Sequence, residues 1–428
     1  MVNRPFRSAP PPGACGKLSY MKTTSLLLAI SFCALCAEHP RRVSPAAAQR
    51  LAAIPARFQE LVDRNQLAGA VLLVEQHGEV ALLKALGYQN LELRTPMRTD
   101  SIFQIMSMTK PITAAGLMIL VEEGKVILTD PVEKYLPEFH NQPAPLETSA
   151  PPAVPGLPRR GPRRMAVWNL LTHTNGMSDP PADQRKQIQY DMGLSLADAV
   201  KFYAAQPPRF EPGARWAYSN EGLATAGRII EVVSGEPYEK FIDERILKPL
   251  GMRDSFYFPD QTRIPRIAML YRDDQGKLVL PGADVLGGDP TLYRKGAKYP
   301  APEYGLYSTA TDLAAFYQMI LNGGTYRGKR ILSRSTVDAM TTLQTGAFDT
   351  ANRGFGNGLA FMVQKDSEAT LDLLGPGVFG HNGAFGTWVF ADKNKDLIGA
   401  VLIQLSGNNQ FVQHLFSGMV ESAVDRKP

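Results

Sequence analysis

Ser107-Met108-Thr109-Lys110 is the first segment whose residue types and spacing could carry nucleophilic chemistry. On a helix, a hydroxyl and an amine three residues apart share one face, so the lysine can take the serine proton. Pro111 is tolerated only in the first turn of a helix, which predicts that Ser107 lies at the N-terminal end. Free N–H groups there favour developing negative charge, and burial would lower the pKa of Lys110.

This spacing is weak when it stands alone. A second match, Ser19 to Lys22, lies near the start of the chain, where it can carry no such meaning. A helix N-cap serine followed by a solvated lysine fits Ser107 equally well.

Tyr218-Ser219-Asn220 is the second segment, and it precedes a helical pattern from Gly222 to Val233. A tyrosine at this place could share a proton with Lys110 and pass it to a leaving group, while Asn220 orients the lysine or the substrate. Taken alone, the segment fits better as an aromatic packing residue followed by an asparagine helix cap.

His381-Asn382-Gly383-Ala384 is the third segment, predicted at the start of a strand. Gly383 permits close backbone approach, and the N–H of Ala384 could pair with that of Ser107 to hold an oxyanion. A glycine-rich turn between strands is the alternative. His381 could also act as a general base, but no acidic residue at a recognisable spacing would orient it.

Other motifs in the sequence do not indicate a function. Residues 323–329 fit G-x-x-x-x-G-K, but Arg330 replaces the required Ser or Thr and the segment follows a predicted helix rather than a strand. No G-x-S-x-G and no H-E-x-x-H occurs in the chain, so an α/β-hydrolase and a zinc site have no motif behind them. We predict no metal and no cofactor. His173 ends an apolar helical segment, and we predict that it is a structural cap rather than a catalyst.

Apolar patterns indicate the elements that position these segments. A hairpin is predicted at residues 70–75 and 80–86, and a buried helix at 107–123. Helical patterns dominate 167–321, and short strand-like runs at 359–363, 386–390 and 397–404 precede a final helix after Asn409. Strands at both ends therefore bracket a helical middle. This predicts an α/β fold of the α+β type, in which an antiparallel sheet built from both termini is flanked by helices and carries an inserted helical lobe.

The same patterns predict the domain bounds. A catalytic domain covers 49–428, with a sheet lobe at 49–125 and 350–428 and a helical lobe at 126–349. Within the helical lobe, a Pro- and Arg-rich stretch at 141–164 is predicted to be a solvated loop. A site is expected where the two lobes meet.

The first 37 residues have the character of a secretory leader. Met21-Lys22 precedes an uncharged apolar run, Leu26 to Ala37, which is too short to span a bilayer. Cleavage is predicted after Cys36 or as late as Ala48, and Met21 is the more natural start. We therefore expect a periplasmic or extracellular bacterial protein without stable membrane insertion.

Composition restricts the classes that remain. The chain has 428 residues, of which 44% are hydrophobic, so it can bury a large core. Its net charge of +5 arises in the leader, because residues 38–428 hold 42 basic and 41 acidic side chains, and no nucleic-acid partner is predicted. All three cysteines lie within the first 37 residues, so the exported form would contain no disulfide and no thiol nucleophile.

The order and separation of the three segments resemble the serine β-lactamase and penicillin-binding-protein superfamily, specifically class C β-lactamases and family VIII carboxylesterases. The resemblance covers about residues 50–420. It rests on Phe103 to Pro111, Leu170 to Gly176, Trp216 to Asn220, Gly305 to Thr309 and Phe379 to Thr387.

This resemblance implies roles for individual residues. Ser107 matches the acylated nucleophile, Lys110 and Tyr218 match the proton-transfer pair, and Asn220 matches the assisting amide. The N–H groups of Ser107 and Ala384 match the oxyanion hole. His381, Asn382 and Gly383 are expected to bind or assist the substrate.

One departure from the family pattern bears on the substrate. In β-lactamases and peptidases the third motif is usually K-T-G, and His381 stands in place of its lysine. A mostly neutral imidazole is a poor anchor for a carboxylate, which favours neutral esters. We predict a serine hydrolase that cleaves short-chain acyl esters. The alternatives are a β-lactamase or D-amino-acid-specific peptidase and, more remotely, a non-catalytic binding protein. The expected partner is a small-molecule ester or amide, and the sequence does not indicate which oligomeric state the protein has.

Overall fold

The computed structural model describes residues 43–147, 163–346, 348, 354–365 and 373–424. The predicted leader, residues 1–37 with its possible extension to 48, lies outside them except for its last six positions. Most of the predicted 141–164 loop also lies outside them. In the described ranges, no helix combines the length and apolar character that a membrane span requires.

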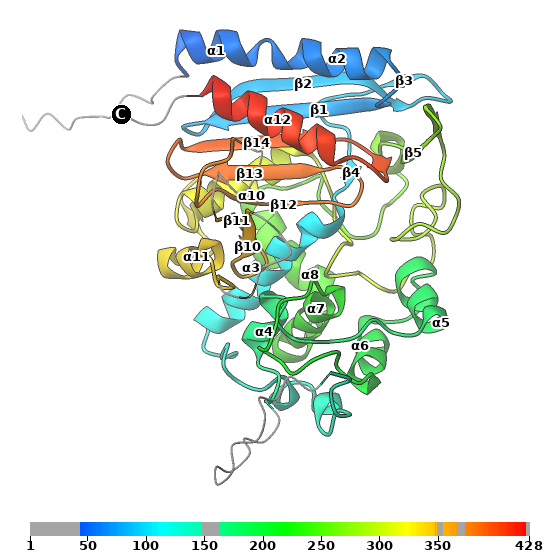
Figure 1. Ribbon diagram of the computed structural model, residues 1–428, viewed down its shortest axis with the longest axis vertical. Helices are drawn as coiled ribbons and strands as arrows, with labels where there is room; N and C mark the ends of the chain where they lie inside the picture. Colours follow the sequence, from blue (N-terminus) through cyan, green and yellow to red (C-terminus); the bar gives the residue numbers. More distant parts are fainter. Residues whose placement is uncertain (1–42, 148–162, 347, 349–353, 366–372, 425–428) are drawn as a thin grey trace, which may run out of the picture. The chain divides into compact units, whose positions relative to one another are not determined.

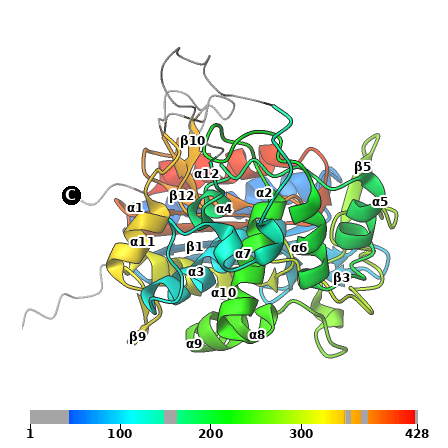
Figure 2. The ribbon, with the colours of Figure 1, turned by 90° about the horizontal axis from the view of Figure 1, so that it is seen from below.

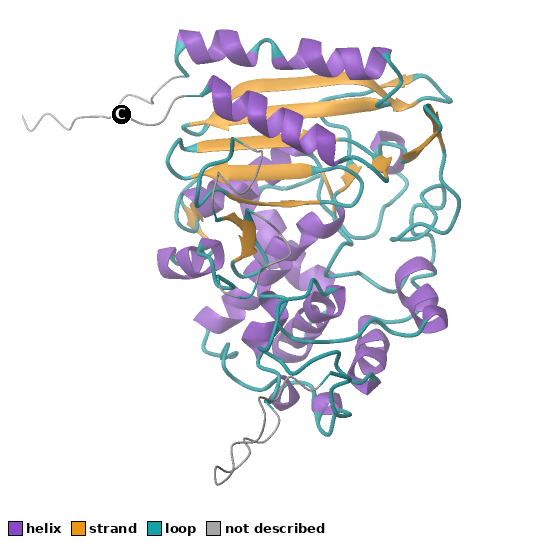
Figure 3. Ribbon diagram, viewed as in Figure 1, coloured by secondary structure: helices purple, strands orange, loops and turns teal. Residues whose placement is uncertain are grey.

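An eight-stranded antiparallel sheet forms the centre of the described chain (Figure 3). Its order is β10-β11-β12-β13-β14-β1-β2-β3, and β1 pairs with β14 through Val71 opposite Leu402. N-terminal and C-terminal segments therefore build one sheet, which confirms the predicted fold class. The strands are β1 (Gly69–Gln76), β2 (Glu79–Asn90), β3 (Thr95–Pro96), β10 (Phe355–Asn357), β11 (Met362–Gln364), β12 (Phe379–Asn382), β13 (Trp388–Asp392) and β14 (Leu397–Leu402).

Both faces of the sheet are covered by helices. Along β1, Leu72 and Val74 pack toward α1 (Pro45–Leu51), α2 (Ile54–Asp63) and α12 (Gln410–Ala423), which lie together on one face (Figure 1). Val71 and Leu73 point the other way, into the larger core. This alternation is the period of two that a strand imposes. Because both faces of β1 are buried in this way, the strand consists almost entirely of apolar residues.

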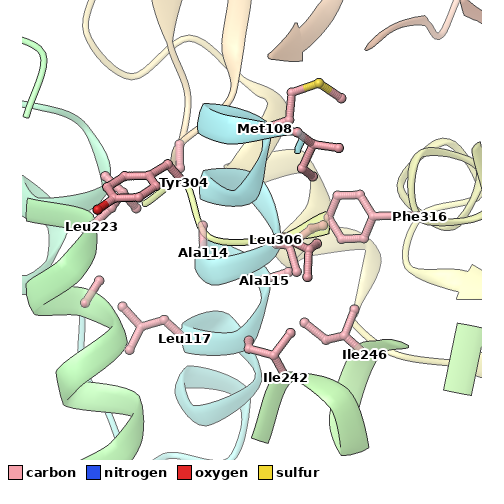
Figure 4. Packing of buried hydrophobic residues seen from close by; sticks show 14 of the residues in the cluster. Met108, Ala114, Ala115, Leu117, Leu223, Ile242, Ile246, Tyr304, Leu306 and Phe316 are labelled. Carbon is pink, nitrogen blue, oxygen red and sulfur yellow. The ribbon is translucent and has the colours of Figure 1, made fainter. Parts of the chain in front are cut away.

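The larger core joins the sheet to the helical part of the chain. Helix α10 (Ala310–Leu321), within the segment assigned from sequence to the helical lobe, packs against β1, β13 and β14. Helix α3 (Thr109–Glu122) runs from the sheet into the helices, with Leu223 of α7 on one side and Phe316 of α10 on the other (Figure 4). Its predicted burial is confirmed, since Thr109 to Leu120 are all buried.

Helix α7 (Asn220–Ser234) is the second central helix. It contacts α3, α4 (Val167–Leu171), α6 (Leu196–Ala205) and α8 (Tyr238–Ile242), and Figure 2 shows it among them. In the described ranges the remaining α-helices are α5 (Ala182–Arg185), α9 (Lys248–Leu250) and α11 (Arg334–Thr341), and short 3₁₀ and π-helical segments lie between the elements. The short strands outside the main sheet are β4 (Phe103–Gln104), β5 (Tyr271–Asp274), β6 (Lys277–Val279), β7 (Tyr307–Ser308), β8 (Thr325–Tyr326), β9 (Lys329–Arg330) and β15 (Leu405–Ser406).

One local prediction was wrong. His381 and Asn382 were predicted to start a strand, and instead they end β12, paired with Val389 and Trp388 of β13. The chain then turns, with the Gly383 N–H donating to the Thr387 carbonyl at 2.8 Å. The apolar run that follows belongs to the next strand, so the glycine-rich stretch closes a hairpin.

Candidate active site

Ser107 lies in a single 3₁₀ turn, Met106–Met108, that leads directly into α3. Lys110 is in the first turn of that helix, and its side chain is fully buried. The Nζ of Lys110 donates to the Ser107 Oγ at 3.0 Å. The spacing of three residues therefore brings hydroxyl and amine into direct contact.

Two further acceptors fix the Lys110 amine. Nζ donates to Asn220 Oδ1 at 2.9 Å and to the Glu303 main-chain carbonyl at 2.8 Å. Asn220 is free for this contact because Ser219 is the N-cap of α7, accepting from the Gly222 N–H at 3.0 Å. Capping by a serine thus leaves the next residue to reach the lysine.

The buried setting controls the charge of Lys110. Loss of solvent lowers the pKa of Lys110 to about 7, although the nearby carboxyl groups of Glu303 and Glu221 act in the opposite direction. An amine with this pKa is about half deprotonated at neutral pH and is therefore available as a base.

Tyr218 completes the constellation from the loop before α7. Tyr218 is 44% exposed, and the Lys110 Nζ lies 4.7 Å from the centroid of its ring. Loss of solvent raises the pKa of Tyr218, although the neighbouring Ser107 side chain acts in the opposite direction. The phenol therefore stays protonated at neutral pH and is suited to donate a proton.

The turn after β12 also comes close to Ser107. A Cβ on Gly383 would collide with the Ile105 carbonyl oxygen and with the Thr387 hydroxyl. Thr387 Oγ1 also donates to that carbonyl at 3.2 Å. Only glycine lets the strand end come this close, which places Ala384 beside Ser107 on the wall of one cavity.

This cavity has a volume of about 470 Å³. Its lining consists of Ser107, Asn382, Gly383, Ala384, Gly407, Asn408, Asn409 and Gln410. Amide groups and backbone dominate this wall, and none of these side chains carries a charge. A ligand held here would meet neutral hydrogen-bonding groups.

His381 lies behind this cavity and not in its lining. It is 1% exposed, and its Nδ1 contacts the Asn382 carbonyl oxygen at 2.7 Å. Burial and then the neighbouring Lys110 lower the pKa of His381 to about 3, so the imidazole is neutral. The Asn382 amide, by contrast, lines the cavity and donates to Gln413 Oε1 at 3.3 Å.

Sequence reasoning missed two buried carboxyl groups behind the lysine. Glu303 Oε1 accepts from the Tyr299 hydroxyl at 2.8 Å, and Glu221 Oε2 accepts from the Ser219 hydroxyl at 3.1 Å. Burial raises the pKa of both groups, to about 7 for Glu303. The only indication of these carboxyl groups in the sequence was their position, since Glu303 closely precedes the Gly305 segment and Glu221 directly follows Asn220.

His173 was predicted to be a structural cap at the end of a helix, and this is confirmed. The C-cap of α4 is Thr172, and His173 follows it in the left-handed conformation with φ 57° that closes many helices, while the Thr174 N–H donates to the Asn169 carbonyl at 3.1 Å. The imidazole stacks on the Tyr218 ring, with 4.6 Å between centroids. His173 therefore belongs to the site.

The remaining motif from the sequence lies outside this site. Residues 323–329, which fit part of a phosphate-binding loop, begin after α10 and run into the β8–β9 hairpin, so the rejection of that motif is confirmed. Across the ranges that the structure describes, no group of three or more His, Cys, Asp or Glu side chains is arranged to hold a metal ion.

Comparison with known proteins identifies the family to which this chain belongs. The β-lactamase family profile matches residues 54–422. Protein Rv1367c of Mycobacterium tuberculosis is 34% identical over 373 residues, which are 82% of this chain and 88% of the relative. Esterase EstB of Burkholderia gladioli is 29% identical over 377 residues, 83% of this chain and 90% of the relative. The solved structure of EstCE1, a hydrolase with promiscuous acyltransferase activity, superposes with a TM-score of 0.75 at 22% identity, covering 88% of this chain and 99% of that one.

Proposed function

The chain belongs to the β-lactamase family and is a hydrolase of that fold, and from this premise we propose that it is a serine carboxylesterase acting on short-chain, uncharged acyl esters. One observation carries the proposal: the Lys110 Nζ lies 3.0 Å from the Ser107 Oγ, in a buried setting that lowers its pKa to about 7. A serine activated in this way can attack an acyl carbon.

The side chains would divide the proton transfers between them. Lys110 takes the Ser107 proton as Oγ bonds to the ester carbonyl carbon, and the N–H groups of Ser107 and Ala384 stabilise the oxyanion. Tyr218, whose phenol is protonated, then gives its proton to the departing alkoxide as the ester C–O bond breaks, and the ammonium of Lys110 returns a proton to the phenolate. Water next attacks the acyl-enzyme as Lys110 takes its proton, and the same pair gives a proton to the Ser107 Oγ as the acyl C–O bond breaks, which releases the acid and restores the serine.

The cavity supports an uncharged substrate. Asn382, Asn408, Asn409 and Gln410 offer only neutral amides beside Ser107, and the buried His381 is neutral. A carboxylate would have to lose water there without meeting a fixed cation in the lining. The relative from Burkholderia gladioli is named an esterase, which agrees with this choice.

The decisive test compares kcat/KM for p-nitrophenyl butyrate and for a chromogenic cephalosporin, with Ser107→Ala as the blank. A large ester preference that is lost in Ser107→Ala supports the proposal. A cephalosporin preference would replace it with the β-lactamase alternative. Failure of a fluorophosphonate probe to label Ser107 would favour a non-catalytic binding protein.

A further inference from the structure

We infer that His173 is a positioning residue that holds Tyr218 in line with Ser107 and Lys110. This inference rests on the proposed function, because that function gives Tyr218 its task as the acid. Tyr218 lies in a loop just before α7, so no regular element fixes its backbone. Some other group must determine where its hydroxyl points.

His173 contacts the chain on both sides of Tyr218. Its main-chain carbonyl accepts from the Ala217 N–H at 2.9 Å, and its Nδ1 accepts from the Ser219 N–H at 3.1 Å. Between these two bonds, the imidazole stacks on the Tyr218 ring at an interplanar angle of 23°. One residue thus holds the backbone before the tyrosine, the ring itself and the backbone after it.

The loop that carries His173 is itself anchored to the same segment. The Thr174 carbonyl accepts from the Gly213 N–H and the Gly176 carbonyl from the Arg209 N–H, both at 2.7 Å. The 173–176 loop therefore docks along residues 209–219, and His173 is its last contact before α7. Movement of this loop would move Tyr218 with it.

Histidine combines two properties that the position requires. A planar ring is needed for the stack, and an acceptor at the Nδ1 position is needed for the Ser219 N–H. Since Nδ1 accepts, the ring proton is assigned to Nε2, and the ring is neutral. Burial, with Lys110 close by, keeps the pKa of His173 well below its usual value, so the acceptor persists at neutral pH. Phenylalanine supplies only the ring, and asparagine supplies only the acceptor.

A double-mutant cycle tests the inference. In the wild-type background, His173→Phe is expected to lower kcat/KM for an ethyl ester by about 10- to 100-fold, since small misplacements of a catalytic group cost factors of this size. In the Tyr218→Phe background, the same change should cost less than about twofold, because the group it positions is already gone. His173→Asn, which keeps the acceptor and tolerates left-handed backbone, should recover part of the rate.

The leaving group supplies a second readout. Ethoxide needs a proton to depart, whereas p-nitrophenolate departs readily without one. Both Tyr218→Phe and His173→Phe should therefore lower kcat/KM more for ethyl butyrate than for p-nitrophenyl butyrate. A purely structural defect would lower both by the same factor.

His77→Phe is the matched control. His77 also has left-handed backbone, with φ 56°, but it lies in the β1–β2 turn, where Nδ1 is 3.2 Å from Asp396 Oδ2. This variant should leave kcat/KM unchanged. If His173→Phe does not fold, the cycle is run with His173→Asn.

Equal losses in both backgrounds, or equal losses for both leaving groups, would overturn the inference while the proposed function stood. An unchanged rate in Tyr218→Phe alone would instead overturn the acid role of Tyr218.

Discussion

Glu303→Gln should shift the pH dependence of catalysis without removing any group from the cleft. Glutamine keeps the acceptor that meets the Tyr299 hydroxyl, and the main-chain carbonyl that accepts from the Lys110 Nζ at 2.8 Å is untouched. Only the negative charge disappears. That charge stabilises the ammonium form of Lys110, so its loss lowers the pKa of the lysine below about 7.

The size of the shift follows from Coulomb's law. At an effective dielectric constant of about 20, a carboxylate that lies near the amine without contacting it contributes roughly 1 to 2 kcal/mol. Because the pKa of Glu303 is itself raised to about 7, only part of its charge is present where Lys110 titrates. The two groups titrate as a pair. We therefore expect the acid limb of the profile to move down by about 1 pH unit.

The assay is kcat/KM for p-nitrophenyl butyrate between about pH 5 and 9, because this parameter reports the titrations of the free enzyme. Glu75→Gln is the matched control, since burial also raises the pKa of Glu75, which lies near the far end of β1 next to the β1–β2 turn. An acid limb that stays in place, or that moves to higher pH, would refute the assignment of Lys110 as the base.

Three further predictions concern stability and the oxyanion hole. The pKa of Glu303 is raised from 4.5 to about 7, so ionisation of this carboxyl opposes folding increasingly across that range. The free energy of unfolding of Glu303→Gln should therefore match that of wild type near pH 4.5 and exceed it by up to about 3 kcal/mol at pH 8. Thermal unfolding at each pH measures this difference. Gly383→Ala should push the strand end away from the Ile105 carbonyl and lower kcat by about 10- to 1,000-fold if the oxyanion donor is displaced, and an unchanged kcat would contradict that role. Ser219→Ala removes the cap that the Gly222 N–H uses and should cost about 1 kcal/mol in urea unfolding, and no loss would show that water caps α7 instead.

Local geometry explains which parts could be predicted from sequence. The contact between Ser107 and Lys110 depends on one helical turn, and Pro111 marks where that turn begins, so spacing and proline together indicated a contact that the spacing alone left undecided. The β1–β2 hairpin was predictable for a similar reason, because β1 and β2 are adjacent apolar runs joined by a short turn. Both predictions need only the nearest neighbours along the chain.

Contacts between distant segments explain what sequence could not provide. Asn220 reaches Lys110 only because α7 packs on α3, and the absence of a side chain at Gly222 lets α7 approach Asn175. The carbonyl of Glu303 comes from a third segment. Resemblance to a family supplied the role of Asn220, whereas no local pattern distinguishes it from a cap.

The two histidines of the site show why residue type alone is a poor guide to protonation. In sequence, His381 was the obvious group to titrate near neutrality, and His173 was set aside as structural. Burial lowers the pKa of both, so each imidazole is neutral over the range in which the enzyme would work. We therefore expect a kinetic pKa near 7, which would ordinarily be assigned to a histidine, to report Lys110 and its partner Glu303. The neutral imidazoles are then free for other tasks: His173 can accept from the backbone beside Tyr218, and His381 adds no positive charge behind the substrate cavity. Because His381 stands where the K-T-G motif has its lysine, the site lacks that anchor for an anion. It also lacks a cation that would have lowered the pKa of Lys110 further.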